Sequence, residues 1–269
     1  MESSLRPTSR RKLGTHRRGR RPRAKIGGVC LLSIALLGAA HAQTTSAATK
    51  KATTTKATKK STAKTTTPKG SAATAGTRSR FKAEVWADNW FSMAANGTVV
   101  GEDSEPITAE RSFNSTTFTF AATYPLTVAI EAKDFKQDDT GLEYIGTAKQ
   151  QMGDGGLIAQ ITDLSSGKVI AATDATWKTM VIHRAPLNPT CAKDSQPENT
   201  CRFSSIAAPA DWTTTGFDDT KWKSATVWTS ADVGPKGGYT NITWNSAARL
   251  VWGTDLHVDN TALLRLTVG

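Results

Sequence analysis

Three stretches decide the fold: residues 154–160 (DGGLIAQ), 173–178 (TDATWK) and 217–225 (FDDTKWKSA). In the first, Gly155 and Gly156 free the backbone to enter a strand from a sharp turn. Residues 157–162 then alternate as a strand with one well-buried face does. The stretch therefore predicts a core strand that starts directly after a turn.

The third stretch is a polar knuckle between two aromatic residues. Phe217 and Trp222 flank the carboxylates of Asp218 and Asp219. Two aromatic rings can anchor a loop while the carboxylates cap its backbone amides. We therefore interpret this knuckle as architecture, with Trp222 buried beside Phe217.

The rest of the chain beyond residue 80 has the period of strands. Residues 81–86, 117–120 and 127–130 alternate with period two, and residues 168–172 follow a Ser-Ser-Gly turn as the return strand of a hairpin would. No window of a dozen residues has convincing helical spacing of apolar residues. Many short strands separated by Gly, Asn, Asp and Pro turns predict an all-β sandwich with few, short helices.

In this order the pieces resemble the galactose-binding-like jelly roll, the accessory β-sandwich of many secreted glycoside hydrolases, rhamnosidase-like enzymes among them. Residues 87–89 (ADN) and 96–101 (NGTVVG) look like a hairpin of that family, residues 125–132 like its next core strand and residues 263–268 like its closing strand. The resemblance covers nearly all of residues 82–268. It implies a jelly-roll β-sandwich but transfers no ligand-binding residue, because sites are grafted onto folds.

Charge divides the chain into two parts. The formal net charge is +11, yet residues 1–80 hold 19 Lys and Arg and a single acid. Residues 81–269 hold the other 15 bases and 22 acids, a formal charge of −7. Because the folding part is mildly acidic, we expect no nucleic-acid-binding domain.

Residues 1–42 have the pattern of a secretory signal peptide. A basic segment, residues 6–25, precedes an apolar run, residues 26–39, that is short for a bilayer span. Ala40-His41-Ala42 then supplies a cleavage pattern, which places the mature start at Gln43. The prediction is a secreted, periplasmic or cell-envelope protein with no membrane span after cleavage; the alternative is an uncleaved anchor helix.

Residues 43–80 consist almost entirely of Thr, Ala, Lys and Ser. Such a segment buries too little apolar surface to offset its ordering entropy, which predicts a disordered cationic tether before a domain at residues 81–269. The tether could hold the domain near anionic surface polymers, or it could be a plain solubilising linker.

Cysteine usage agrees with export. Cys30 leaves with the leader, and Cys191 and Cys201 remain as an even pair ten residues apart. In an oxidising compartment we expect them to form a disulfide. A metal or redox pair is the alternative, but the chain has no Cys-x-x-Cys and no second pair of ligands.

Catalytic signatures are absent from the sequence. The two histidines after the leader, His183 and His257, lie in no nucleophile or metal motif. A glycosidase needs only two carboxylates, for which Glu131 with Asp134, or the Asp218–Asp219 pair, are the candidates. Since the knuckle and the core strand already explain these residues structurally, we predict that the protein is not an enzyme.

Sugar binding would use exposed aromatic faces with a few fixed polar groups at the rim. Trp86 and Trp90 flank Asp88 and Asn89, which makes these four residues the candidate ligand-binding rim. The alternative is that the aromatic rings pack in the core, as the resemblance implies for the tryptophans at 177, 212 and 222.

Calcium is the candidate cofactor, with a structural role. The most acidic loop, residues 134–143, offers Asp134, Asp138 and Asp139, and oxygen ligands of this kind suit the ion. No fixed calcium spacing is met, so a solvated acidic loop is the alternative.

Together these observations predict an exported, non-catalytic binding module. Its expected ligand is a carbohydrate or cell-surface glycan, on the family resemblance alone. A structural adhesion or envelope protein without a small ligand is the second hypothesis, and a hydrolase or hydrolase accessory fragment is the third.

Overall fold

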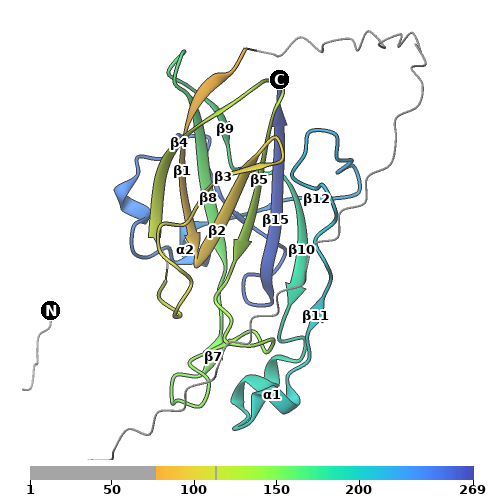
Figure 1. The fold of residues 1–269 in the computed structure, drawn as a ribbon. Helices are drawn as coiled ribbons and strands as arrows, with labels where there is room; N and C mark the ends of the chain where they lie inside the picture. Colours follow the sequence, from red (N-terminus) through yellow and green to blue (C-terminus); the bar gives the residue numbers. More distant parts are fainter. Residues whose placement is uncertain (1–76, 113) are drawn as a thin grey trace, which may run out of the picture. The chain divides into compact units, whose positions relative to one another are not determined.

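Two antiparallel sheets pack into a β-sandwich over residues 77–112 and 114–269, the part of the chain that the computed structural model describes (Figure 1). The predicted signal peptide and nearly all of the predicted tether lie outside the described residues. The first strand begins at Ser79, two residues before the predicted domain start at Phe81. The prediction of an all-β sandwich is confirmed.

Sheet A has the order β13-β14-β8-β1-β4, and β9 also pairs with β8. Its strands are β1 (Ser79–Asp88), β4 (Asn114–Ala122), β8 (Gly156–Asp163), β9 (Lys168–Ala172), β13 (Thr226–Trp228) and β14 (Leu250–Trp252). Sheet B has the order β11-β10-β15-β5-β2-β3, and β12 also pairs with β10. Its strands are β2 (Trp90–Ala95), β3 (Thr98–Glu102), β5 (Leu126–Lys133), β10 (Lys178–Arg184), β11 (Ser204–Ser205), β12 (Lys223–Ser224) and β15 (Asp259–Val268).

The remaining elements are short. A small two-stranded sheet pairs β6 (Leu142–Glu143) with β7 (Gln151–Met152). The helical turns are η1 (Pro189–Lys193), α1 (Pro197–Thr200), α2 (Ser230–Val233) and η2 (Tyr239–Asn241). Helices are therefore few and short, as predicted, and within the described ranges none is long and apolar enough to cross a membrane.

The core forms from alternate residues of facing strands. Phe81 and Val85 of β1 are fully buried in one apolar cluster with Val128 and Ile130 of β5. Because side chains alternate across a strand, the period-two pattern of the sequence places these residues between the sheets. The predicted hairpin between β2 and β3 also forms.

The geometry of the turn between β2 and β3 explains why its two residues are Asn and Gly. Asn96 and Gly97 both have positive φ, 49° and 85°. A two-residue turn with positive φ at both central positions is type I′, which favours Asn-Gly and matches the twist of the flanking strands.

The β8 strand differs from the prediction in one respect, because both of its faces are buried. The segment between β13 and β14 covers the outer face of sheet A. The Gln160 side chain donates to the Thr243 carbonyl (3.3 Å) and accepts from the Asn245 amide (2.6 Å). On the neighbouring β1 strand, the Trp86 indole donates to the Gly237 carbonyl (2.9 Å).

The β15 strand is the centre of sheet B, paired with β5 on one side and β10 on the other. Its Thr267 hydroxyl lies 2.8 Å from that of Thr127, 140 residues away in the sequence. This strand also carries Arg265, a buried cation in an otherwise apolar run.

Candidate functional site

A groove of about 510 Å³ lies along β10, where it runs beside β12 and the Gly253–Thr254 turn that follows β14. Its apolar walls are Met180, Val181, Phe217 and Trp222. Figure 1 places β10 and β12 at the edge of sheet B, away from the β2–β3 hairpin. The groove therefore opens at the side of the sandwich where the two sheets end.

The wall that contains Phe217 and Trp222 is the predicted knuckle. Trp222 is 8% exposed, and its ring meets Phe217 edge-on at 5.6 Å and stacks on Trp212 at 6.0 Å. The Thr220 amide donates to Asp218 (3.0 Å), so one carboxylate does cap the loop backbone. Trp222 packs against the protein, yet part of its surface borders the groove.

Arg265 fixes this wall to sheet B. Its guanidinium donates to the carbonyls of Thr214 (2.8 Å) and Phe217 (3.1 Å) and to the Asp219 carboxylate (2.5 Å). It also lies over the Phe217 ring, 5.3 Å from the centroid. A buried cation that makes three such contacts holds the loop in one position.

The polar side of the groove has one ion pair and two donor groups that have no hydrogen-bond partner among the residues that the structure describes. Arg184 Nε lies 2.7 Å from Asp259 Oδ1, and the Asp255 amide donates to the other oxygen of Asp259 (3.1 Å). Thr179 borders the groove, and its hydroxyl is buried and has no hydrogen-bond partner within the described part of the chain. Lys223, also at the groove, makes no side-chain hydrogen bond or ion pair to any residue that the structure describes. A buried donor without a partner is rare and points to a ligand or ordered water.

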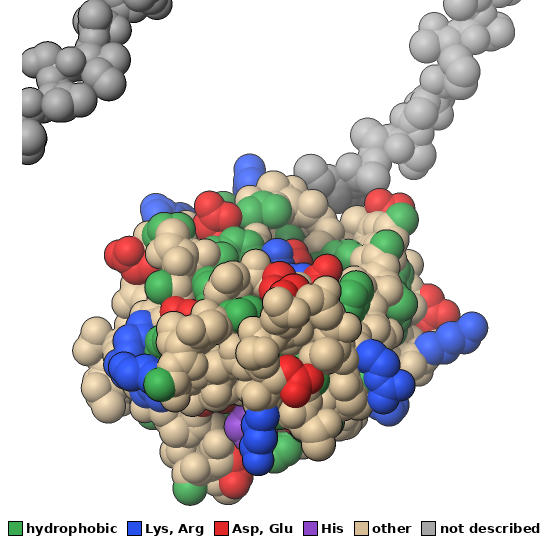
Figure 2. Space-filling view, turned by 90° about the horizontal axis from the view of Figure 1, so that it is seen from below, with side chains coloured by type: hydrophobic (Ala, Val, Ile, Leu, Met, Phe, Trp, Pro, Cys, Tyr) green, Lys and Arg blue, Asp and Glu red, His purple; other side chains and the backbone are tan. Residues whose placement is uncertain are grey.

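A second polar region lies at one end of the sandwich, where four carboxylates gather. Asp88 ends β1, Asp134 follows β5, Glu143 ends β6 and Asp154 precedes β8; we call these four the carboxylate cluster. Lys236 reaches it, with Nζ 3.6 Å from Asp154 Oδ2. Figure 2 views the molecule from this end, with acidic and basic side chains on the visible face, but Asp88, Asp134 and Glu143 themselves are at most 3% exposed.

Burial and mutual repulsion change the protonation of the carboxylate cluster. Burial first, and then the Asp154 carboxylate, raise the pKa of Asp88 to about 8, although Lys236 opposes the shift. Burial and the charges of Glu143 and Asp88 raise the pKa of Asp134 well above its usual range, and burial also raises the pKa of Glu143. At neutral pH, Asp88 therefore holds a proton.

His183 adjoins this region from β10. Its Nε2 lies 3.1 Å from Asp139 Oδ1, and its ring stacks on Phe203 at 5.9 Å. Burial lowers the pKa of His183, so the ring is neutral at pH 7. Nearby, the Asn260 amide donates to Asp134 Oδ2 (3.1 Å). The result is a buried polar layer, not an open catalytic centre.

The predicted exposed rim of Trp86, Asp88, Asn89 and Trp90 is not present. Trp86 and Asn89 are fully buried, Asp88 is 2% exposed, and Trp90 is half-buried under Lys133, whose Nζ lies 4.9 Å from its ring. Asn89 has a structural role, since its side chain accepts from the Phe135 amide and donates to the Glu110 carbonyl. The hydrophobic effect places these rings in the core, as the alternative interpretation held.

The predicted calcium ligands Asp134, Asp138 and Asp139 do not converge. Asp134 is buried and bonded to Asn260, Asp138 accepts from the Thr140 amide and hydroxyl, and Asp139 pairs with Lys136. Across residues 77–112 and 114–269, no three Asp, Glu, His or Cys side chains form a group that could hold a metal ion.

The two candidate carboxylate pairs are also engaged elsewhere. Glu131 pairs with Lys133 (3.1 Å), whereas Asp134 is buried at the end of the same strand. Asp218 caps the knuckle and Asp219 binds Arg265. Each of the four carboxylates has a structural partner.

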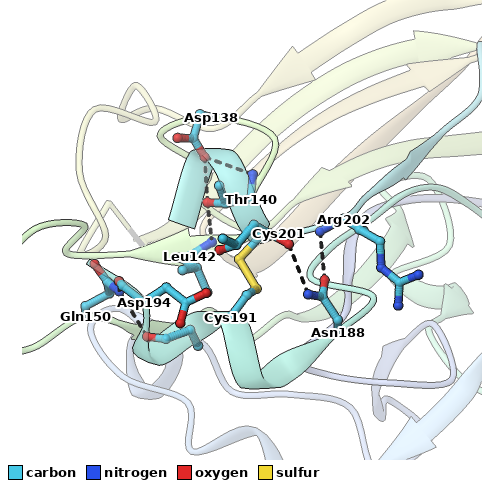
Figure 3. The surroundings of a disulfide bond; sticks show 11 residues. Asp138, Thr140, Leu142, Gln150, Asn188, Cys191, Asp194, Cys201 and Arg202 are labelled. Atoms are coloured by element: carbon cyan, nitrogen blue, oxygen red, sulfur yellow. Dashed lines mark hydrogen bonds between the residues drawn. A yellow bond between two sulfur atoms is a disulfide. The ribbon is translucent and has the colours of Figure 1, made fainter. Parts of the chain in front are cut away.

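Cys191 and Cys201 form the predicted disulfide, which joins η1 to the residue after α1 (Figure 3). Asn188 lies beside it and bridges the Thr200 carbonyl and the Arg202 amide. Gln150 ties the same unit to the β6–β7 region through the carbonyls of residues 192 and 194. The disulfide therefore stabilises a loop that crosses the end of the sandwich.

Sequence reasoning missed the groove residues Thr179, Arg184, Lys223 and Asp259, as well as Arg265. One signal could have found Arg265, because a lone cation inside the apolar run of residues 263–266 requires buried partners. No signal could have found Thr179, because its lack of a partner depends on tertiary packing.

No protein-family model matches the chain, and it matches neither a curated protein nor a solved structure.

Proposed function

We propose that the domain is a galactose-binding-like jelly roll that acts as a non-catalytic carbohydrate-binding module, with the glycan in the groove beside Trp222. The single observation that carries this proposal is the groove itself. Its volume of about 510 Å³ lies within the usual range of small-ligand sites. Apolar and aromatic walls suit the apolar faces of sugars, and the polar groups of β10 suit their hydroxyls.

Export and tethering belong to the same proposal. The disulfide supports an oxidising compartment, since such bonds persist outside the cytosol. We propose that residues 1–42 direct the protein to the cell envelope or beyond, and that residues 43–80 keep the module close to anionic surface polymers.

A glycan array with the exported protein tests the proposal. Met180 is half-buried at the groove, so Met180→Arg fills part of the site without removing core volume. Val99→Arg is the matched control, because Val99 is 65% exposed on β3, at the other edge of sheet B. We expect Met180→Arg to lose binding and Val99→Arg to keep it. A wild-type protein that binds no glycan on the array overturns the proposal.

A further inference from the structure

We infer that the glycan of this groove is acidic, with its carboxylate or sulfate group held between the Thr179 hydroxyl and the Lys223 ammonium. This inference rests on the proposed carbohydrate function and specifies its ligand. Thr179 of β10 and Lys223 of β12 are directly opposite each other in the strand ladder. Opposite residues of an antiparallel pair place their Cβ atoms about 4.5–5.5 Å apart on the same face. The two donors can therefore reach one oxyanion.

Both donors lack a partner among the described residues. The Thr179 hydroxyl is buried, and it finds no acceptor among the residues described. Lys223 is exposed, and its ammonium makes no ion pair or hydrogen bond with that part of the chain. A buried hydroxyl without an acceptor is destabilising, and an anion at this position removes that cost while it gains a charge-assisted hydrogen bond.

The charge balance of the groove favours an anion. Three cations, Arg184, Lys221 and Lys223, border it against the carboxylates of Asp218 and Asp259. Asp259 already accepts from Arg184 and from the Asp255 amide, and Asp218 from the Thr220 amide. The groove therefore offers more open donors than acceptors, although residues 81–269 as a whole are acidic. A positively charged groove on an acidic domain attracts anions and selects against neutral sugars.

Isothermal titration of the exported full-length protein with tetragalacturonate tests the inference. The matched ligand is the methyl-esterified tetramer, which has the same backbone without the charges. We expect the acid to bind about tenfold more tightly than the ester, because an ionic hydrogen bond is lost with the charge. A sulfated disaccharide and its neutral parent, compared in the same way, distinguish sulfate from carboxylate as the bound group.

Two conservative variants locate the anion. Lys223→Gln weakens binding of the acid by about tenfold and Thr179→Val by about fivefold, and neither changes binding of the ester. Thr179→Val keeps the side-chain shape, and an altered fold is checked from the melting temperature. Lys168→Gln, which removes an exposed cation on β9 of sheet A, is the control for the loss of one positive charge.

Each outcome is decisive. Equal binding of acid and ester, lost together in Met180→Arg, overturns the acidic ligand and leaves the carbohydrate function intact. Acid binding that is unchanged in Thr179→Val and Lys223→Gln places the anion outside the groove and also overturns the inference. If none of the acidic or neutral glycans binds, the carbohydrate function fails, and the inference fails with it.

Discussion

Asp88→Asn tests the energetics of the carboxylate cluster. Asp88 is 2% exposed, its Oδ2 has no hydrogen-bond partner in the described ranges, and its pKa is raised from 3.8 to about 8. The folded state therefore binds a proton at pH values where the unfolded chain has released it. The contribution of Asp88 to the free energy of unfolding is largest below pH 4 and falls as the pH rises towards 8.

The expected loss of stability follows from the raised pKa of Asp88. A pKa difference of one between the folded and unfolded states corresponds to about 1.4 kcal/mol. Asp88 should therefore account for a loss of about 4 kcal/mol in the free energy of unfolding between pH 5 and pH 8. Asparagine is a neutral replacement of similar shape, and Asp88→Asn should lose less stability by this amount over the same interval. Asp134 and Glu143, whose pKa values are also raised, retain their share of the pH dependence.

Urea unfolding followed by tryptophan fluorescence at pH 5 and pH 8 measures the effect. Glu102→Gln, at an exposed site on β3, is the control for the loss of one carboxylate and should follow the wild type. If Asp88→Asn loses as much stability as the wild type from pH 5 to pH 8, Asp88 does not hold a proton in the folded protein and our account of the cluster is wrong.

Four further predictions concern packing, charge, cross-linking and the tether. Trp222→Ala should cost about 3–5 kcal/mol in urea unfolding, since Trp222 is 8% exposed; an unchanged melting temperature contradicts its structural role. Arg265→Met should cost about 3 kcal/mol and increase proteolysis of the knuckle loop, because three part-buried acceptors lose their buried donor; a loop that is cleaved no faster than in the wild type contradicts this role of Arg265. The Cys191→Ser, Cys201→Ser double variant should lose about 2–3 kcal/mol, and non-reducing mass spectrometry of the wild type should detect no free thiol. Deletion of residues 43–76 should leave the melting temperature unchanged but weaken retention on an anionic polymer at low salt; retention that is insensitive to salt assigns binding to the domain.

The strands were predictable because local chemistry determines them. Asn96-Gly97 specifies its hairpin turn through positive φ at two residues, and the alternation of β1 specifies its buried face. The cover on the outer face of β8 was not predictable, because Gln160 meets Thr243 and Asn245 only after the whole sandwich has formed. From the sequence alone, a polar residue in a strand is predicted to face solvent, because its distant hydrogen-bond partner is not known.

The site was harder to predict than the fold. Trp86 and Trp90 were reasonable candidates for a sugar platform, because an aromatic residue near polar neighbours has the same sequence at a surface and in a core. The groove depends on residues from four separate parts of the chain, and its open donor, Thr179, is an ordinary strand residue in the sequence. The knuckle around Trp222 was recognisable in the sequence, but as architecture and not as the wall of a groove.

The position of β15 in the middle of sheet B has a consequence for how the chain reaches its native state. Until β15 docks, β5 and β10 each lack a neighbour on the side that β15 occupies, and the knuckle loop lacks the cation that holds it. Contacts that span 140 residues make such a topology slow to assemble. A newly made chain therefore exposes two unpaired strand edges for an extended time, which gives holding chaperones an interval in which to bind it.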